Sequence, residues 1–207
     1  DSLAGVFIRA LLVSRDGRLW VGTDADGVSV YDPDTETFVR HAHHPERSDS
    51  LSHDQVRALA EDAQGRIWAG TRAGLDRIDP VSGRVSRQDR ASDADAPDAD
   101  QRVFALIFDR AGDLWIGGWN GLTRRSAADG SHVRIRDPRL TGQLIMSLYE
   151  LADGRIGVGT AQVGSFLITP QTRSVMAIPV DLKRTPSATE ALALAMIQPR
   201  DDELWLG

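Results

Sequence analysis

Short apolar runs alternate with polar turns along the chain, and the alternation repeats five times. The apolar runs lie at 8–13, 56–60, 103–108, 145–149 and 193–197. Behind each run comes a segment of one form, Asp-Gly-Arg-Leu-Trp-Val-Gly-Thr in its first copy, and the copies lie at 16–23, 64–71, 111–118, 153–160 and 201–207. Self-similarity of this kind indicates a repeat protein.

The repeat length and the number of apolar segments in each repeat predict the architecture. Trp20, Trp68, Trp115, Gly157 and Trp205 occupy one column, at spacings of 48, 47, 42 and 48 residues. Four short apolar segments within such a period indicate a four-stranded β-propeller blade, whereas helical repeats would show a period of 3.6 residues. The first repeat predicts strands at 8–14, 19–23, 28–31 and 38–40, separated by turn residues.

We therefore predict an all-β chain that forms a β-propeller of four full four-stranded blades plus the start of a fifth. The expected blades span about 1–48, 49–95, 96–138, 139–186 and an incomplete 187–207, all within a single partial propeller domain at 1–207. Two further columns fit the crowding of blades near the propeller axis. Small residues occupy the positions equivalent to Ala10 in each repeat, and glycines occupy the positions equivalent to Gly22. These columns are predicted to be framework.

Composition excludes several classes of function. The chain has 24 Lys and Arg against 30 Asp and Glu, a net charge of -6, which disfavours binding to a nucleic-acid backbone. No apolar stretch approaches the length of a membrane span, so this segment is expected to have no direct membrane contact. The absence of cysteine excludes disulfides and thiol catalysis. With no glycine-rich phosphate loop before a helix, no cofactor is expected.

Two clusters of polar side chains offer donor atoms for metals. Histidines lie at His41, His43, His44 and His53, and a carboxylate run comprises Asp93, Asp95, Asp98 and Asp100. The histidines surround Pro45 in an expected inter-blade loop, and the acidic run lacks the turn glycine and terminal acid of a calcium loop. Both are interpreted as solvated loops, and no metal site is predicted.

The repeat resembles a known family. An apolar strand, the Asp-Gly-Arg-Leu-Trp-Val-Gly-Thr segment, a short loop and a glycine that opens the next strand (Gly27, Gly74, Gly121) are similar to the two-component regulator propeller repeat. The fourth repeat departs from the pattern, with Gly157 in the tryptophan column and Gly164 one residue late. The resemblance implies a periplasmic sensor domain of a hybrid histidine kinase or a diguanylate cyclase. Since such receptors carry many more blades, it also implies an incomplete fragment.

A glycosidase alternative rests on the aspartate box of sialidase propellers. Ser14 to Trp20 is close to that box, but it lacks the residue between aspartate and glycine and the threonine before tryptophan. In sialidases the box is a turn element, and hydrolysis would need two carboxylates facing one sugar, which the sequence does not place. The chain is therefore predicted not to be an enzyme.

The loops that join second to third strands are the predicted ligand site, because in propellers they open on one face around the axis. Their residues differ from blade to blade, as an asymmetric site requires. Trp119 beside Asn120 suits stacking on a sugar ring, and Arg72 suits a carboxylate. The candidate ligand-binding residues are Asp24, Asp26, Arg72, Trp119, Asn120 and Gln162.

The leading hypothesis is a non-catalytic module that senses a small molecule, with a sugar-derived compound as candidate. The alternatives are a propeller scaffold that binds a partner protein and, third, a propeller lyase or glycosidase. A homodimer is expected as well, because apolar residues at 8–13 and 193–197 would lie on uncovered blade faces.

Overall fold

The computed structural model describes residues 3, 5, 7–88, 101–178, 196–200 and 203–206. These residues form strands, turns and bends, with no helix among them. Within that part of the chain there is accordingly no helix long and apolar enough to cross a membrane. The strands form four sheets of four and one pair.

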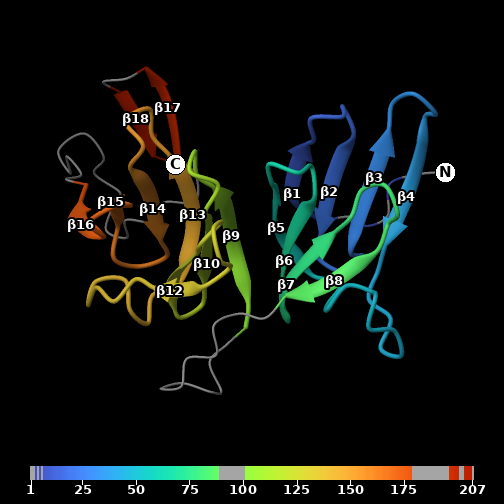
Figure 1. Cartoon of the computed structure of the whole chain (residues 1–207), viewed down its shortest axis with the longest axis horizontal. Coiled ribbons are helices and arrows are strands. Elements are labelled where there is room, and N and C mark those ends of the chain that lie inside the picture. The colour runs from blue at the N-terminus through green and yellow to red at the C-terminus, as the bar shows by residue number, and fades with distance from the viewer. Residues whose placement is uncertain are drawn as a thin grey trace. The chain divides into compact units, whose positions relative to one another are not determined.

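Each four-stranded sheet is an antiparallel meander in chain order, as a propeller blade requires (Figure 1). Blade one comprises β1 (Ile8–Val13), β2 (Leu19–Thr23), β3 (Val28–Asp32) and β4 (Thr37–His41). Blade two comprises β5 (Val56–Glu61), β6 (Ile67–Thr71), β7 (Gly74–Ile78) and β8 (Val85–Gln88). The strands predicted from the first repeat agree with these bounds to within a residue.

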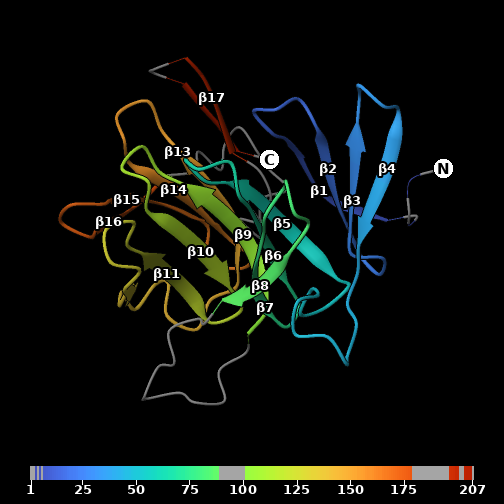
Figure 2. The same cartoon turned by 45° about the vertical axis from the view of Figure 1, so that its right-hand side comes forward.

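The second half of the chain repeats this arrangement. Blade three comprises β9 (Val103–Phe108), β10 (Leu114–Gly118), β11 (Gly121–Arg125) and β12 (His132–Arg134), and Figure 2 shows β9, β10 and β11 as neighbours. Blade four comprises β13 (Ile145–Glu150), β14 (Ile156–Thr160), β15 (Ser165–Thr169) and β16 (Ser174–Ala177). The pair β17 (Met196–Arg200) and β18 (Glu203–Leu206) begins a fifth. The predicted all-β class with four full blades is confirmed.

The chain divides into two compact units, residues 1–104 and 105–207. The single domain expected from the repeat therefore stays a prediction, and the two units are described separately. In the first unit, Trp20, Val28 and Val30 of blade one pack with Ile67 and Ile78 of blade two. The second unit has the corresponding core, built from Trp115, Leu122, Ile156, Phe166 and Ile168.

In blades one to three, a buried hydrogen bond ties the tryptophan of the repeat column to the turn that precedes its strand. The indole Nε1 of Trp68 donates to Asp62 Oδ2 at 2.9 Å, and that of Trp115 donates to Asp109 Oδ2 at 2.8 Å. In blade one, the indole of Trp20 donates to the Ser14 hydroxyl at 3.0 Å. In these three blades the acceptor stands six residues before the tryptophan.

Blade four loses both partners of this bond together. Gly157 replaces the tryptophan, and six residues earlier Leu151 replaces the polar acceptor and is buried. An aspartate left there without its indole would be a buried acceptor lacking one of its donors, which destabilises a fold. The departure of blade four from the repeat is thus a matched pair of changes.

The loop of blade four, which contains the late Gly164, has the same geometry as the loop of blade one. Thr160 Oγ1 donates to the carbonyl of Gly164 at 2.7 Å, just as Thr23 Oγ1 donates to that of Gly27 at 3.0 Å. Blade two closes the same bond over one residue fewer, from Thr71 to Gly74. Blades one and four therefore share the longer connection between second and third strands.

Arginine side chains join neighbouring blades inside each unit. Arg15 of blade one donates to the carbonyls of Asp62 and Ala63 in blade two, at 2.7 and 3.2 Å. In the other unit, Arg110 of blade three donates to the carbonyls of Leu151 and Ala152 in blade four, at 3.1 and 2.7 Å. We call these contacts the arginine staples.

A second arginine in each unit extends the staples. Arg18 donates to the carbonyl of Pro80 at 2.9 Å, and Arg124 donates to the carbonyl of Pro170 at 3.0 Å. The acceptors lie in equivalent turns, at the end of the third strand of blades two and four. Arg15 and Arg110 hold the same place in the repeat, whereas Arg18 lies just before β2 and Arg124 lies within β11.

The glycine column of the second strands marks a close approach, as predicted. A Cβ added to Gly117 would lie 2.7 Å from Cγ2 of Ile145, at the start of the next inner strand. At Gly22 the corresponding neighbour is Cγ1 of Val56, at 3.0 Å. The first strand of one blade thus packs directly on the second strand of the blade before it.

We expect Trp68→Ala to lower the free energy of unfolding by about 3 to 5 kcal/mol, because the change leaves a large cavity in the core. The Trp68 side chain is 1% exposed, and Asp62 would lose its indole donor. Trp119→Ala is the control, since Trp119 is 41% exposed, and it should change stability by less than about 1 kcal/mol. Urea unfolding measures both. Equal losses would show that Trp119 belongs to the framework.

Candidate functional site

Polar side chains gather in the first unit where β1 and β5 begin and β2 and β6 end. Asp24 follows β2, and its Oδ1 accepts hydrogen bonds from Arg9 Nε and Gln55 Nε2, both at 2.9 Å. Arg72 follows β6, and its backbone N–H donates to the carbonyl of Gln55 at 3.0 Å. Gln55 therefore links two of the predicted site residues, Asp24 and Arg72, which lie in different blades.

Arg57 completes this group. Its guanidinium carbon lies 4.8 Å from the centre of the Phe104 ring, and its Nε donates to Gln55 Oε1 at 3.3 Å. Contact with an aromatic face holds a guanidinium in place while leaving its in-plane N–H groups available. We call Arg9, Asp24, Gln55, Arg57 and Arg72 the arginine rim.

Positive charge outweighs negative charge on the arginine rim. The hydrogen bond from Arg9 lowers the pKa of Asp24, which therefore stays ionised at neutral pH. Burial, and then the charge of Arg9, lower the pKa of Arg57, the charge of Asp24 raises it in part, and Arg102 and Arg72 lower it more weakly. Burial and the charge of Arg72 lower the pKa of His53 nearby. The arginine rim thus contains three arginines and one carboxylate, and that carboxylate is hydrogen-bonded to Arg9.

The other predicted residue of this unit is turned toward the outer strand. Asp26 Oδ1 accepts from Arg40 at 3.1 Å, and its carbonyl accepts from Arg40 Nε at 2.7 Å. Its N–H donates to Thr23 Oγ1 at 2.9 Å. The structure thus ties Asp26 to β4 and Asp24 to the arginine rim.

The remaining predicted residues lie in the second unit. Trp119 and Asn120 form the tight connection between β10 and β11, and the Trp119 ring is partly exposed. The carbonyl of Asn120 accepts a hydrogen bond from Arg134 at 2.5 Å. Gln162 is exposed in the loop between β14 and β15. Their role in binding stays a prediction.

The histidine cluster is dispersed into separate structural roles. His41 stacks on Trp20, with ring centres 6.0 Å apart, and His43 Nδ1 bonds to the carbonyl of Leu51 at 2.6 Å. His53 Nδ1 accepts from the backbone N–H of Gln55 at 2.8 Å. No group of three or more His, Cys, Asp or Glu that could hold a metal occurs among the described residues. The acidic run Asp93, Asp95, Asp98 and Asp100 lies outside them.

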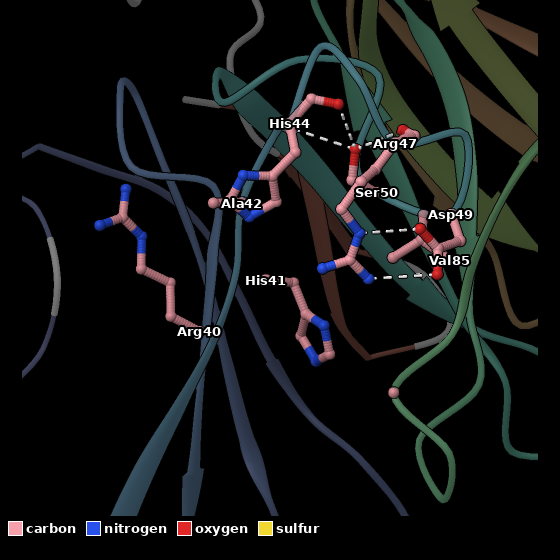
Figure 3. Close-up of a pocket in the computed structure, with 9 residues that line it drawn as sticks. Arg40, His41, Ala42, His44, Arg47, Asp49, Ser50 and Val85 are labelled. Atoms are coloured by element: carbon pink, nitrogen blue, oxygen red, sulfur yellow. Dashed lines mark hydrogen bonds and ion pairs between the residues drawn. The ribbon is translucent and has the colours of Figure 1, made fainter.

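A small polar cavity of about 170 Å³ lies beside His41 in the first unit (Figure 3). It is lined by the end of β4, the loop after it and the β7–β8 hairpin, through Arg40, His41, His44, Arg47, Gly83 and Val85. Arg47 is held by two bonds to Asp49, of 3.0 and 3.1 Å. Burial lowers the pKa of His41, so its imidazole is neutral at physiological pH. The arginines of this cavity are already paired, unlike Arg72 of the rim.

The first unit also contains a buried carboxyl group, that of Asp76 on β7. Asp76 Oδ2 accepts from the N–H and the hydroxyl of Ser52 at 2.7 and 2.9 Å, and Ser52 also contacts the Thr71 hydroxyl at 2.7 Å. Asp76 Oδ1 is buried without a partner. Burial raises the pKa of Asp76. Its sequence signal is an acid between Leu75 and Arg77 in a strand that is otherwise buried at both ends.

Comparison with known proteins identifies the repeat. The profile of the two component regulator propeller family matches residues 2–25, 50–73 and 98–120. Three segments of this chain, one for each of the first three blades, therefore match the two component regulator propeller repeat. The matched segments of these propeller repeats contain Trp20, Trp68 and Trp115 and the first two residues after each second strand. No match is found among curated proteins.

Solved structures share the fold. The extracellular domain of a hybrid two-component system from B. thetaiotaomicron is 20% identical, with a TM-score of 0.79 over 100% of this chain and 26% of that chain. The extracellular domain of a one-component system from the same organism is also 20% identical, with a TM-score of 0.80 over 98% of this chain and 26% of that chain. The chain therefore spans about a quarter of the length of these sensor structures.

Propeller enzymes are also similar. Virginiamycin B lyase from Staphylococcus aureus is 18% identical, with a TM-score of 0.75 over 97% of this chain and 62% of that chain. A streptogramin B lyase is 16% identical, with a TM-score of 0.76 over 100% of this chain and 63% of that chain. At such identities the likeness establishes the β-propeller fold, which the propeller repeats share with both sensors and lyases.

We expect Asp76→Asn to change how stability depends on pH. Since the folded state raises the pKa of Asp76, it keeps this proton at pH values where the unfolded chain, with a pKa of about 4, has lost it. The buried carboxylate of Asp76 therefore lowers the free energy of unfolding most at pH values above its pKa in the folded state. Urea unfolding between pH 4 and 8 should show the variant gaining stability relative to wild type as pH rises. A constant difference would contradict the shifted pKa.

Proposed function

We propose that this chain is part of a non-catalytic, ligand-sensing propeller in the periplasmic portion of a bacterial transmembrane receptor, of the sensor kinase or diguanylate cyclase type. Its propeller repeats match the two component regulator family, and similar solved structures are extracellular domains of such systems. Sensor structures give TM-scores of 0.79 to 0.81, against 0.73 to 0.76 for the lyases. The proposed ligand is a small molecule, with a sugar-derived compound as candidate.

The arginine rim is the observation that carries this proposal. The framework of each blade repeats the same residues, whereas Asp24 in blade one and Arg72 in blade two hold equivalent places after the second strand and carry opposite charges. Gln55 joins them through its amide and its carbonyl. A repeated scaffold that carries dissimilar polar groups at one rim has the makings of a specific binding site.

Signalling would follow if the ligand binds one arrangement of a receptor dimer better than another. A homodimer is therefore part of the proposal. Leu11 and Val13 on β1 are 64% and 70% exposed, and an isologous contact would bury this apolar patch twice.

The test is a small-molecule panel followed by two-dimensional NMR of the labelled chain. We expect sugars or sugar derivatives from the panel to shift the N–H signals of Asp24, Gln55 and Arg72. Arg72→Ala should weaken the binding of the strongest compound about tenfold, the loss expected for a hydrogen bond to a charged group, with an unchanged melting temperature. Trp119→Ala tests the second predicted position in the same way.

The competing functions predict different results. A lyase would consume quinupristin, which a virginiamycin B lyase structure contains, and we expect the substrate to remain intact after prolonged incubation with this chain. A constitutive scaffold would bind a partner protein and leave the panel without effect. Either outcome would overturn the sensing proposal.

We expect the chain to form dimers at micromolar concentration, measured by light scattering. Leu11→Glu should shift the population toward monomer, because the change places a charge in the apolar patch. Val81→Glu is the control, since Val81 is 93% exposed on the β7–β8 turn and lies outside that patch. A monomer at high concentration for the unchanged chain would refute the dimer.

A further inference from the structure

We propose that the arginine rim selects ligands that carry a carboxylate group, with Arg57 and Arg72 as the residues that bind it. The inference rests on the proposed sensing function and names the chemical class of the ligand. It follows from the charges of the rim, from the N–H groups that its arginines leave free, and from the way Arg57 is held.

The charges come first. Asp24 is the carboxylate of the arginine rim, and its Oδ1 is already shared by Arg9 and Gln55. Arg9 is therefore compensated, whereas Arg57 and Arg72 are each linked to the rim through an uncharged group of Gln55. Two cationic groups thus remain for one external anion, although the chain as a whole has a net charge of -6.

The free donors come second. A guanidinium has five N–H donors, and among the described residues Arg57 uses only its Nε–H, in a long bond of 3.3 Å to Gln55. The Arg72 side chain is exposed, and only its backbone N–H bonds within the part of the chain that the structure describes. Two forked donor groups are therefore free to bind planar oxygen pairs, the geometry that a carboxylate presents.

The placement of Arg57 makes the site selective. Phe104 supports its guanidinium at 4.8 Å, and Gln55 holds its Nε, so little side-chain freedom remains to be lost on binding. The lowered pKa of Arg57 reflects burial and positive neighbours, which an anion would offset. A neutral sugar would form hydrogen bonds here but would leave the repulsion between the arginines in place.

The charged groups around the arginine rim include some that attract an anion and some that repel it. Arg9, Arg57 and Arg72 attract an anion, and Arg102 adds to the positive field at Arg57. Asp24 repels an anion, and Asp54 contributes negative charge near His53. Because Asp24 accepts its two bonds through Oδ1, Asp24→Asn can keep an acceptor there while removing the negative charge.

The experiment titrates the chain with D-glucuronate and with D-glucose, which differ in one carboxylate, and with acetate as the smallest probe. Calorimetry gives the affinity, and NMR of arginine Nε–H groups gives the site. We expect D-glucuronate and acetate to shift the Arg57 signal, and D-glucose to bind at least about tenfold more weakly than D-glucuronate.

Three variants test the assignment. Arg72→Gln should weaken D-glucuronate binding about tenfold, and because Arg72 is exposed the variant should fold normally. Asp24→Asn should strengthen binding severalfold, since it removes the repelling charge. Arg84→Gln, on the β7–β8 turn of the same unit, is the matched control and should leave the affinity unchanged.

The outcomes separate this inference from the function on which it rests. If D-glucose binds the rim as tightly as D-glucuronate, or Arg72→Gln has no effect while the rim signals still shift, the carboxylate inference is wrong and the sensing function stands. If neither acidic probe perturbs Arg57, the inference is likewise wrong. If no compound of the wider panel reaches the rim, the sensing proposal fails as well.

Discussion

In blades one to three, the hydrogen bond from a buried indole to the preceding turn joins the second strand to the hairpin before it. Trp20, Trp68 and Trp115 fill the core with their rings, while the indole N–H reaches back six residues to Ser14, Asp62 or Asp109. One residue thus sets both the packing of the second strand and the shape of the hairpin before it. In blade four both positions change together, since glycine at 157 occurs with Leu151 at the acceptor position.

The framework was predictable because its determinants are local and repeated. The segment Leu19–Thr23 was predicted as a strand with its observed bounds, since a turn pair precedes it and a glycine opens the next strand a few residues later. The column of Gly22 also indicated a close approach, and the structure places Val56 there. Five copies of one motif supply this information, so a single sequence is sufficient to read it.

The candidate site was only partly predictable, because its contacts join residues without a repeated pattern. Loop positions led to Asp24 and Arg72, but nothing in the sequence indicated that Gln55 would connect them, across 31 residues in the case of Asp24. Arg57 was missed because it lies inside a strand, 47 positions before the Phe104 ring that supports it. Asp26 looked equivalent to Asp24, yet its neighbour Arg40 comes from the outer strand.

The arginine staples carry a consequence for how the protein opens. Arg15 and Arg110 each bind backbone carbonyls of the following blade, and Arg18 and Arg124 do so again at a second turn. Breaking one blade away from its partner therefore exposes several carbonyls and a charged side chain at once. Local unfolding should accordingly proceed by pairs of blades, with amide protons of β2 and β6 exchanging as one cooperative group, and those of β10 and β14 as another.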